Sequence, residues 1–235
     1  DRETLTKDTL LITVSNGRIS RWLRFDAFPV LPPVIIEQVL SKLLNRTLKQ
    51  KMRDRFEANI NKPQRVSIAF RIESDSPVEI SGLVYSRLPT EQETGFKFHL
   101  DARFQTGIDR GRIKSPKEDP LISWLFDQLT ELAGAIPDRL RNINWLKPAV
   151  WSLFPLPGEA KEFFVSISDA LLNSLKSGAF IPDSEGGAHL PSEVFLFHRR
   201  ELYSLLSLDD LRNLTGVKNA VWPHPELLSG RPVEP

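Results

Sequence analysis

The first segments of the chain place apolar residues as β-strands do. Residues 9–14 form a β-branched apolar run, and the Asn16-Gly17 pair that follows is typical of tight hairpin turns. Residues 18–25 then alternate polar and apolar side chains with a period of two. The pattern predicts an antiparallel hairpin at the start of the chain.

A helical pattern follows this hairpin. Apolar residues recur every three or four positions from Val34 to about Ala58, and Pro33 suits the first turn of a helix. Residues 59–63 are expected to end this helix. Its opposite face is basic, with Asp54 and Glu57 as the counterweights, and carries Lys42, Arg46, Lys49, Lys51, Arg53 and Arg55.

Three more segments alternate as half-buried strands do. They are residues 65–72, 78–87 and 96–104, and residues 88–95 join the second to the third. We expect these three strands to form an antiparallel meander.

Two strong helical patterns lie in the second half of the chain, at about 119–132 and 159–176, the second ended by Gly178. Short extended pieces are expected at 179–182 and 193–197, on either side of a turn at Gly186-Gly187. Ser207 has the sequence context of a helix N-cap.

Together these elements predict an α+β protein. We expect a mixed, largely antiparallel sheet with packed helices, followed by a smaller mixed α/β segment. The periodicity weakens between Pro137 and Pro157, where two tryptophans and several prolines occur, and we place a boundary near 142–157. We therefore divide the chain into domains at 1–142 and 143–235.

Composition removes several classes of function. With 31 Lys and Arg against 30 Asp and Glu, the formal net charge is +1, which gives no global attraction to nucleic acid or anionic membranes. The chain has no cysteine, which excludes disulfides, zinc fingers and a cysteine nucleophile. Its histidines are scattered at positions 99, 189, 198 and 224 without metal-ligand spacing, so a metal site is not expected.

No apolar run reaches the ~20 residues that a membrane helix needs, and the chain does not open with a leader pattern. We therefore expect no membrane partner and an intracellular, cytoplasmic location. Because the chain opens with Asp1 rather than Met, we also expect it to be a piece of a longer protein.

A motif series between residues 80 and 112 carries a family resemblance. It runs from Ser81-Gly82 through Leu88-Pro89-Thr90, Thr94-Gly95, Asp101-Ala102-Arg103-Phe104 and Asp109-Arg110. In this order and spacing it resembles the region downstream of the ATPase domain in sacsin-type GHKL ATPases, which are relatives of the ninety-kilodalton heat-shock chaperone. Looser likeness extends over residues 8–140. The segments 179–182 and 190–194 resemble a later proline and glycine-rich piece of the same proteins.

The resemblance implies a transducer-like domain beside an upstream ATP-binding domain of the same parent chain. ATP and magnesium are then expected only with that upstream domain, no cofactor is expected in this chain, and the chain alone is not an enzyme. In that family one cation of the transducer reaches the γ-phosphate. Arg110 occupies the comparable place here, and arginine suits phosphate because it keeps its charge and presents a planar fork of donors.

Alternatives stay open at this point. Lys97, Arg112 and Lys114 are competing cations for phosphate, and Arg110 can equally be a plain surface arginine in a turn, paired with Asp109. The basic helix and the 105–116 loop also fit a nucleic-acid-associated module, although a solvated helix face is the simpler interpretation of the helix. A protein client or partner, and a homo-oligomer formed through the parent protein, complete the expected partners.

Overall fold

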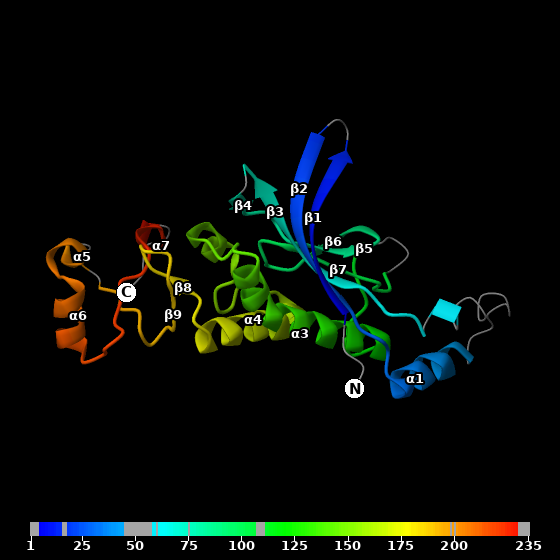
Figure 1. Ribbon diagram of the computed structural model, residues 1–235. Coiled ribbons are helices and arrows are strands. Elements are labelled where there is room, and N and C mark those ends of the chain that lie inside the picture. The colour runs from blue at the N-terminus through cyan, green and yellow to red at the C-terminus, as the bar shows by residue number, and fades with distance from the viewer. Residues whose placement is uncertain are drawn as a thin grey trace.

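A computed structural model gives the fold (Figure 1) and describes residues 5–15, 18–44, 58–59, 61–74, 76–106, 111–197, 199 and 201–229. A twisted sheet lies over a layer of helices. A small C-terminal part follows at the end of this layer, remote from the first helix. The fold is α+β with a mixed, largely antiparallel sheet and packed helices, as the sequence predicts.

The main sheet has the strand order β1-β2-β3-β7-β5-β6, and β4 pairs with the far end of β3. The strands are β1 (Leu5–Ser15), β2 (Arg18–Phe28), β3 (Val66–Glu73), β4 (Ser76–Val78), β5 (Leu83–Ser86), β6 (Leu88–Glu93) and β7 (His99–Ala102).

The predicted hairpin is confirmed. β1 and β2 pair antiparallel over their full length, from Leu5 opposite Phe28 to Ser15 opposite Arg18. Only part of β2, from Arg21 to Ala27, also pairs with β3, so the end of the hairpin near its turn extends beyond the sheet, as Figure 1 shows.

The predicted meander is wrong in two respects. Residues 88–93 form the edge strand β6 rather than part of a connection, and β5 pairs with β7 in parallel instead of with β3. After β5 the chain turns outward into β6 and then returns between β3 and β5. β7 therefore runs antiparallel to β3 and parallel to β5. Pro89 is compatible with β6 because this strand lies at the edge of the sheet.

Helix α3 (Pro120–Asn142) covers one face of the sheet. Asp119 caps its N-terminus by accepting a hydrogen bond from the Leu121 amide, and Pro120 occupies the first turn. The helix continues past the predicted end at 132 and contains Pro137. Helix α4 (Val165–Ser177) packs along α3, and α1 (Pro33–Leu44) also contacts α3. The predicted continuation of α1 through residues 45–57 lies outside the described residues.

The core lies between the sheet and α3. Alternate residues of the central strands face it, among them Phe25, Ile68, Phe70 and Leu100. Phe96 and Phe98 stack with ring centroids 4.8 Å apart, and Phe164 meets Phe96 edge-on from the α4 side.

This core continues beyond residue 142. The 3-10 helices η1 (Pro148–Leu153) and η2 (Glu162–Phe164) contribute Leu153 and Phe164 to it, and α4 contributes Ile167 and Leu171. Residues 148–175 and the preceding sheet thus share one hydrophobic core. The division of the chain at 142 stays a prediction.

The small C-terminal part joins short elements: β8 (Ile181–Pro182), β9 (Ala188–His189), α5 (Leu202–Leu205), α6 (Leu208–Thr215) and α7 (Pro225–Ser229). The predicted helix start at Ser207 is confirmed, and Ser207 and Asp210 form a reciprocal capping box. Among the described residues, no helix combines the length and apolar character needed to cross a membrane.

Candidate functional site

Two regions of the sheet gather the side chains that could carry function. The first is the end of the sheet where the parallel strands β5 and β7 finish. Val84 lies opposite Leu100 and Tyr85 opposite Asp101, so both strands reach the same end. The Ser86 hydroxyl donates to the Phe104 carbonyl over 2.7 Å and ties the two strand ends together.

The arginine-bearing loop singled out by the sequence begins at this end. Arg110 itself lies outside the described residues. The base of the loop is closed by a bridge between Thr106 and Ile113, and the Lys114 amide donates to the Gln105 carbonyl over 3.1 Å. The Lys114 ammonium donates to the side-chain oxygen of Gln105 over 2.9 Å.

Strand β6 supports the far side of the same loop. The Glu91 amide donates to the Gly111 carbonyl over 3.1 Å, and the next side chain, Arg112, is exposed. Arg87 follows β5 and Arg103 follows β7, and both are exposed at this same end of the sheet. No ion pair joins Arg87, Arg103 or Arg112 to another residue in the part of the chain that the structure describes.

Lys97 is placed differently from the other predicted cations. It precedes β7 whereas Arg112 and Lys114 follow it, and its ammonium forms an ion pair with Glu79 over 2.9 Å. The same ammonium donates to the Ser152 carbonyl over 2.9 Å and so links the chain before β7 to η1. The structure thus brings Arg112 and Lys114 together at the loop and puts Lys97 at the other end of β7.

A cavity of about 270 Å³ lies beside the loop base, lined in part by Arg87, Thr90 and Thr106. Arg87 has a positive φ of 65°, unusual for a residue with a side chain, which turns the backbone sharply between β5 and β6. The Thr90 hydroxyl is satisfied by the Val84 carbonyl at 2.8 Å.

The second region lies on the sheet face opposite α3. Side chains that alternate with the core residues face this side, and the strand registers align them in two rows. One row holds Arg24, Ala69 and His99. The other holds Asp26, Ser67, Asp101 and Tyr85.

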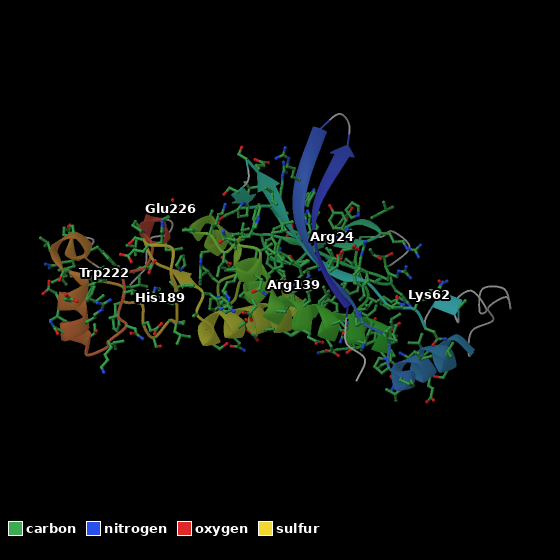
Figure 2. The ribbon with its side chains drawn as sticks, viewed as in Figure 1. Arg24, Lys62, Arg139, His189, Trp222 and Glu226 are labelled. Atoms are coloured by element: carbon green, nitrogen blue, oxygen red, sulfur yellow. The ribbon has the colours of Figure 1, made fainter. Side chains whose placement is uncertain are left out.

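Three rings meet on this face. Trp22 of β2 and His99 of β7 lie with ring centroids 5.0 Å apart, and Tyr85 of β5 lies 4.9 Å from His99. They border a hollow of about 260 Å³ whose lining is mostly apolar; we call it the aromatic hollow, and it is lined by Trp22, Arg24, Ser67, Ala69, Tyr85, His99 and Asp101. Figure 2 labels Arg24 on this part of the sheet and Arg139 on the helix layer.

Two side chains with shifted pKa values line the aromatic hollow. Burial, with a further contribution from the Arg71 guanidinium, lowers the pKa of His99 to about 4, so the imidazole is neutral at pH 7. Its Nδ1 accepts a hydrogen bond from the Leu83 amide over 3.0 Å, which places the remaining proton on Nε2. Burial and the nearby carboxylate of Asp101 raise the pKa of Tyr85 above its ordinary value.

The charged side chains around the hollow are paired. Asp26 is fully buried; its carboxylate accepts from the Ser67 hydroxyl at 2.6 Å and from the Arg24 guanidinium at 2.8 Å. Asp101 forms an ion pair with Arg65. From the other side of the sheet, Arg139 of α3 donates to the Asp26 carbonyl over 3.2 Å.

A third group of polar side chains lies in the C-terminal part. His189 Nε2 and Asp183 Oδ2 are 2.7 Å apart, and Asp183 Oδ1 also accepts from the amides of Glu185 and Gly187 at 2.8 Å each. These contacts close the predicted turn at Gly186-Gly187. Within the described ranges, no three histidine or acidic side chains are grouped so that they could hold a metal ion.

The aromatic hollow cannot be predicted from the sequence alone. Taken one by one, Trp22 and His99 are isolated residues without a motif, and only the strand register brings them together across Ala69. The available signal was the alternation that puts His99 and Asp101 on one side of the predicted strand at 96–104.

Comparisons with known proteins add no family assignment: no protein-family model, no curated protein and no solved structure matches the chain.

Proposed function

We propose that this chain is the nucleotide-coupled middle region of a GHKL ATPase similar to sacsin, relaying the ATP state of an upstream ATP-binding domain to a client or partner protein. The observation that carries the proposal is the placement of the arginine-bearing loop. Its two ends are fixed by the Thr106–Ile113 bridge at the carboxyl ends of two parallel strands, where ligands commonly meet α/β sheets.

Charge supports the same assignment. Arg87 and Arg103 are exposed at this end of the sheet, and Arg112 is exposed between the two ends of the loop that the Thr106–Ile113 bridge closes. Arginines keep their charge at any physiological pH and form bidentate hydrogen bonds to phosphate oxygens. Arg110 is the proposed γ-phosphate contact, with Arg112 and Lys114 as the neighbouring alternatives.

In this proposal ATP and magnesium bind the upstream domain, and the present chain supplies a cation and a movable surface. The chain alone should therefore neither bind ATP tightly nor hydrolyse it. That the chain contacts a client or partner protein, and that it is located in the cytoplasm, are part of the same proposal.

The test is ATP turnover by the full-length protein that contains this chain, comparing wild type, Arg110→Ala and Arg199→Ala. Arg199 is an exposed arginine of the C-terminal part and serves as the matched control. We expect turnover to fall at least about tenfold in Arg110→Ala, because a phosphate-contacting arginine stabilises transferred charge, and to be unchanged in Arg199→Ala. Equal turnover in all three proteins would remove Arg110 from this role, and a full-length protein without ATPase activity would overturn the proposal.

The exposed arginines also favour a second candidate, a nucleic-acid-associated module. In that case, binding of the chain to generic DNA should weaken steeply as salt rises, since each phosphate contact releases counterions. Weak, salt-insensitive binding would remove this candidate.

A further inference from the structure

The aromatic hollow is a site that the nucleotide-coupling role does not use. It lies on the open sheet face, and its floor is low because β3 contributes the small residues Ser67 and Ala69 there. Its walls come from the neighbouring strands: Trp22 from β2, His99 from β7 and Tyr85 from β5. Four strands therefore build one hollow around the gap left by the two small side chains of β3.

The size and lining of the hollow limit what can enter it. At about 260 Å³ it is slightly smaller than the roughly 300–1,000 Å³ of typical small-molecule pockets, so it fits one ring system rather than an extended ligand. Aromatic side chains that line such a hollow favour a planar ring, because offset or tilted ring contacts add about 0.5–1.5 kcal/mol to simple apolar burial.

The lining of the hollow contains hydrogen-bond donors and acceptors that a ligand can use. The His99 Nδ1 is occupied by the Leu83 amide, which leaves Nε2–H as a donor. Neither His99 Nε2 nor the Tyr85 hydroxyl has a hydrogen-bond partner among the described residues. Asp101 uses Oδ2 for Arg65 and retains Oδ1 as an acceptor. The hollow thus offers two donors and one acceptor to a ligand.

Charge excludes simple ions. Each carboxylate near the hollow is balanced by an arginine, since Arg24 pairs with Asp26 and Arg65 pairs with Asp101. A bound ammonium or phosphate would therefore find an opposite charge that is already taken, and would lose hydration without a compensating partner. A neutral ligand has no such penalty.

We propose that the aromatic hollow binds a neutral planar heteroaromatic ring with both donors and acceptors on its edge, the chemistry of a nucleobase. The ring packs over Ala69 and against the Trp22, Tyr85 and His99 rings. Its acceptors meet His99 Nε2–H and the Tyr85 hydroxyl, and its donor meets Asp101 Oδ1. This site is separate from the arginine-bearing loop, and the proposal does not depend on the role proposed for that loop.

The ring can belong to a free nucleoside or to an unpaired base of a single strand. The experiment titrates the 235-residue chain with adenosine, guanosine, cytidine and uridine, and separately with a single-stranded RNA of mixed sequence. Binding is followed by chemical shifts of the tryptophan indole and histidine ring protons. Tetramethylammonium and inorganic phosphate are titrated as charged probes of the same site.

Two variants test the geometry. Ala69→Leu fills the floor of the hollow, whereas Ala135→Leu adds the same atoms at an exposed position of α3 and is the matched control. Tyr85→Phe removes one donor and leaves the volume unchanged, so it stays informative if Ala69→Leu fails to fold.

We expect at least one nucleoside to saturate the shifts, Ala69→Leu to weaken its binding at least about tenfold, Tyr85→Phe to weaken it several-fold, and Ala135→Leu to have no effect. Binding of the RNA alone, with the same sensitivity to Ala69→Leu and Tyr85→Phe, supports the site with a single strand as its source. The proposal is overturned if neither nucleosides nor RNA bind, if binding is insensitive to both variants, or if a charged probe occupies the hollow in preference to the nucleosides.

Discussion

The indole of Trp22 lies against the imidazole of His99, with ring centroids 5.0 Å apart, although their strands β2 and β7 are separated by β3. The contact closes over Ala69, which stands between the two strands at the register position of Arg24 and His99. A single small residue in the central strand thus allows rings from its two neighbours to meet. The small side chain of Ala69 also leaves the aromatic hollow open beside these two rings.

The environment of His99 predicts a pH dependence of stability. The folded pKa is about 4, against an ordinary value of 6.5, because burial and Arg71 disfavour the charged ring. Between pH 6.5 and 4 the unfolded chain takes up a proton at His99 that the folded chain does not, so the free energy of unfolding falls as the pH falls. Since the ring is partly solvated and screened, we expect an effect on the order of 1 kcal/mol.

Urea denaturation of wild type and His99→Asn at pH 7, 5.5 and 4.5 checks this. Asparagine keeps an acceptor for the Leu83 amide but does not titrate, so the variant should lose this part of the pH dependence. His224→Asn is the control, since His224 Nδ1 likewise accepts a backbone amide, that of Glu226. A pH dependence that survives in His99→Asn would contradict the assignment.

Asp26 is expected to be the most sensitive polar position of the sheet. Its carboxylate is buried and accepts hydrogen bonds from Ser67 and Arg24. Asp26→Ala removes both bonds and leaves the Ser67 hydroxyl and the Arg24 charge without their partner, so we expect a loss of about 3 kcal/mol in unfolding free energy. Ser67→Ala should lose only about 1 kcal/mol. Similar losses in the two variants by urea denaturation at pH 7 would show that the carboxylate is not the centre of this network.

The sequence patterns predict a local element well where a short run of neighbouring residues determines that element. The Asn16-Gly17 pair and its flanking strands predict the β1–β2 hairpin, and the apolar period predicts the start of α3. Strand β6 was missed because residues 88–93 combine Pro89 with mostly polar side chains, which suits an edge strand as well as a loop. The parallel pairing of β5 and β7 depends on where the chain re-enters the sheet, and no local pattern encodes this.

The two candidate sites also differ in how far the sequence alone predicts them. The arginine-bearing loop lies in a contiguous motif, so it can be proposed as a site from the sequence alone, and its role stays a prediction. The aromatic hollow needs the registers of β2, β3, β5 and β7 together, and a one-residue slip in any strand would turn its side chain to the core. Single residues such as Trp22 and His99 therefore carry no recognisable signal before pairing is known.

The turn between β8 and β9 depends on Asp183. Burial alone would raise the pKa of Asp183, but hydrogen bonds from His189, Gly187 and Glu185, with the charge of His189, lower it below 3.8. The stabilisation is therefore present above pH 3.8 and is lost as the pH falls through the lowered value.

Asp183→Ala removes all three hydrogen bonds and should speed amide exchange of Gly187 and Glu185 by about tenfold or more at neutral pH, corresponding to a local loss of roughly 1.5–3 kcal/mol. Asp183→Asn keeps the Oδ1 acceptor for both amides and should show a smaller change. Equal exchange in wild type and Asp183→Ala would mean that the turn is held by other contacts.

Gly95, in the connection between β6 and β7, marks the place where the segment after α3 packs against this connection. It has a φ of 83°, and a Cβ atom there would lie 2.1 Å from the Glu159 carbonyl oxygen. The Lys161 amide donates to the Thr94 carbonyl over 3.0 Å, so the two segments are held together at this point. Gly158 has nearly the same φ, 86°, but a Cβ atom there would meet nothing within 4 Å.

Alanine substitutions at the two glycines therefore separate the cost of a left-handed backbone from the cost of a close contact. Gly158→Ala should lose about 1–2 kcal/mol of unfolding free energy from the left-handed backbone alone. Gly95→Ala should lose about 2 kcal/mol more, because residues 159 and 160 must move away from residue 95 to admit the methyl group. Urea denaturation of both variants at one pH measures the difference. Equal losses would show that residues 159 and 160 move easily, and that residues 156–161 are not anchored to the β6–β7 connection through this contact.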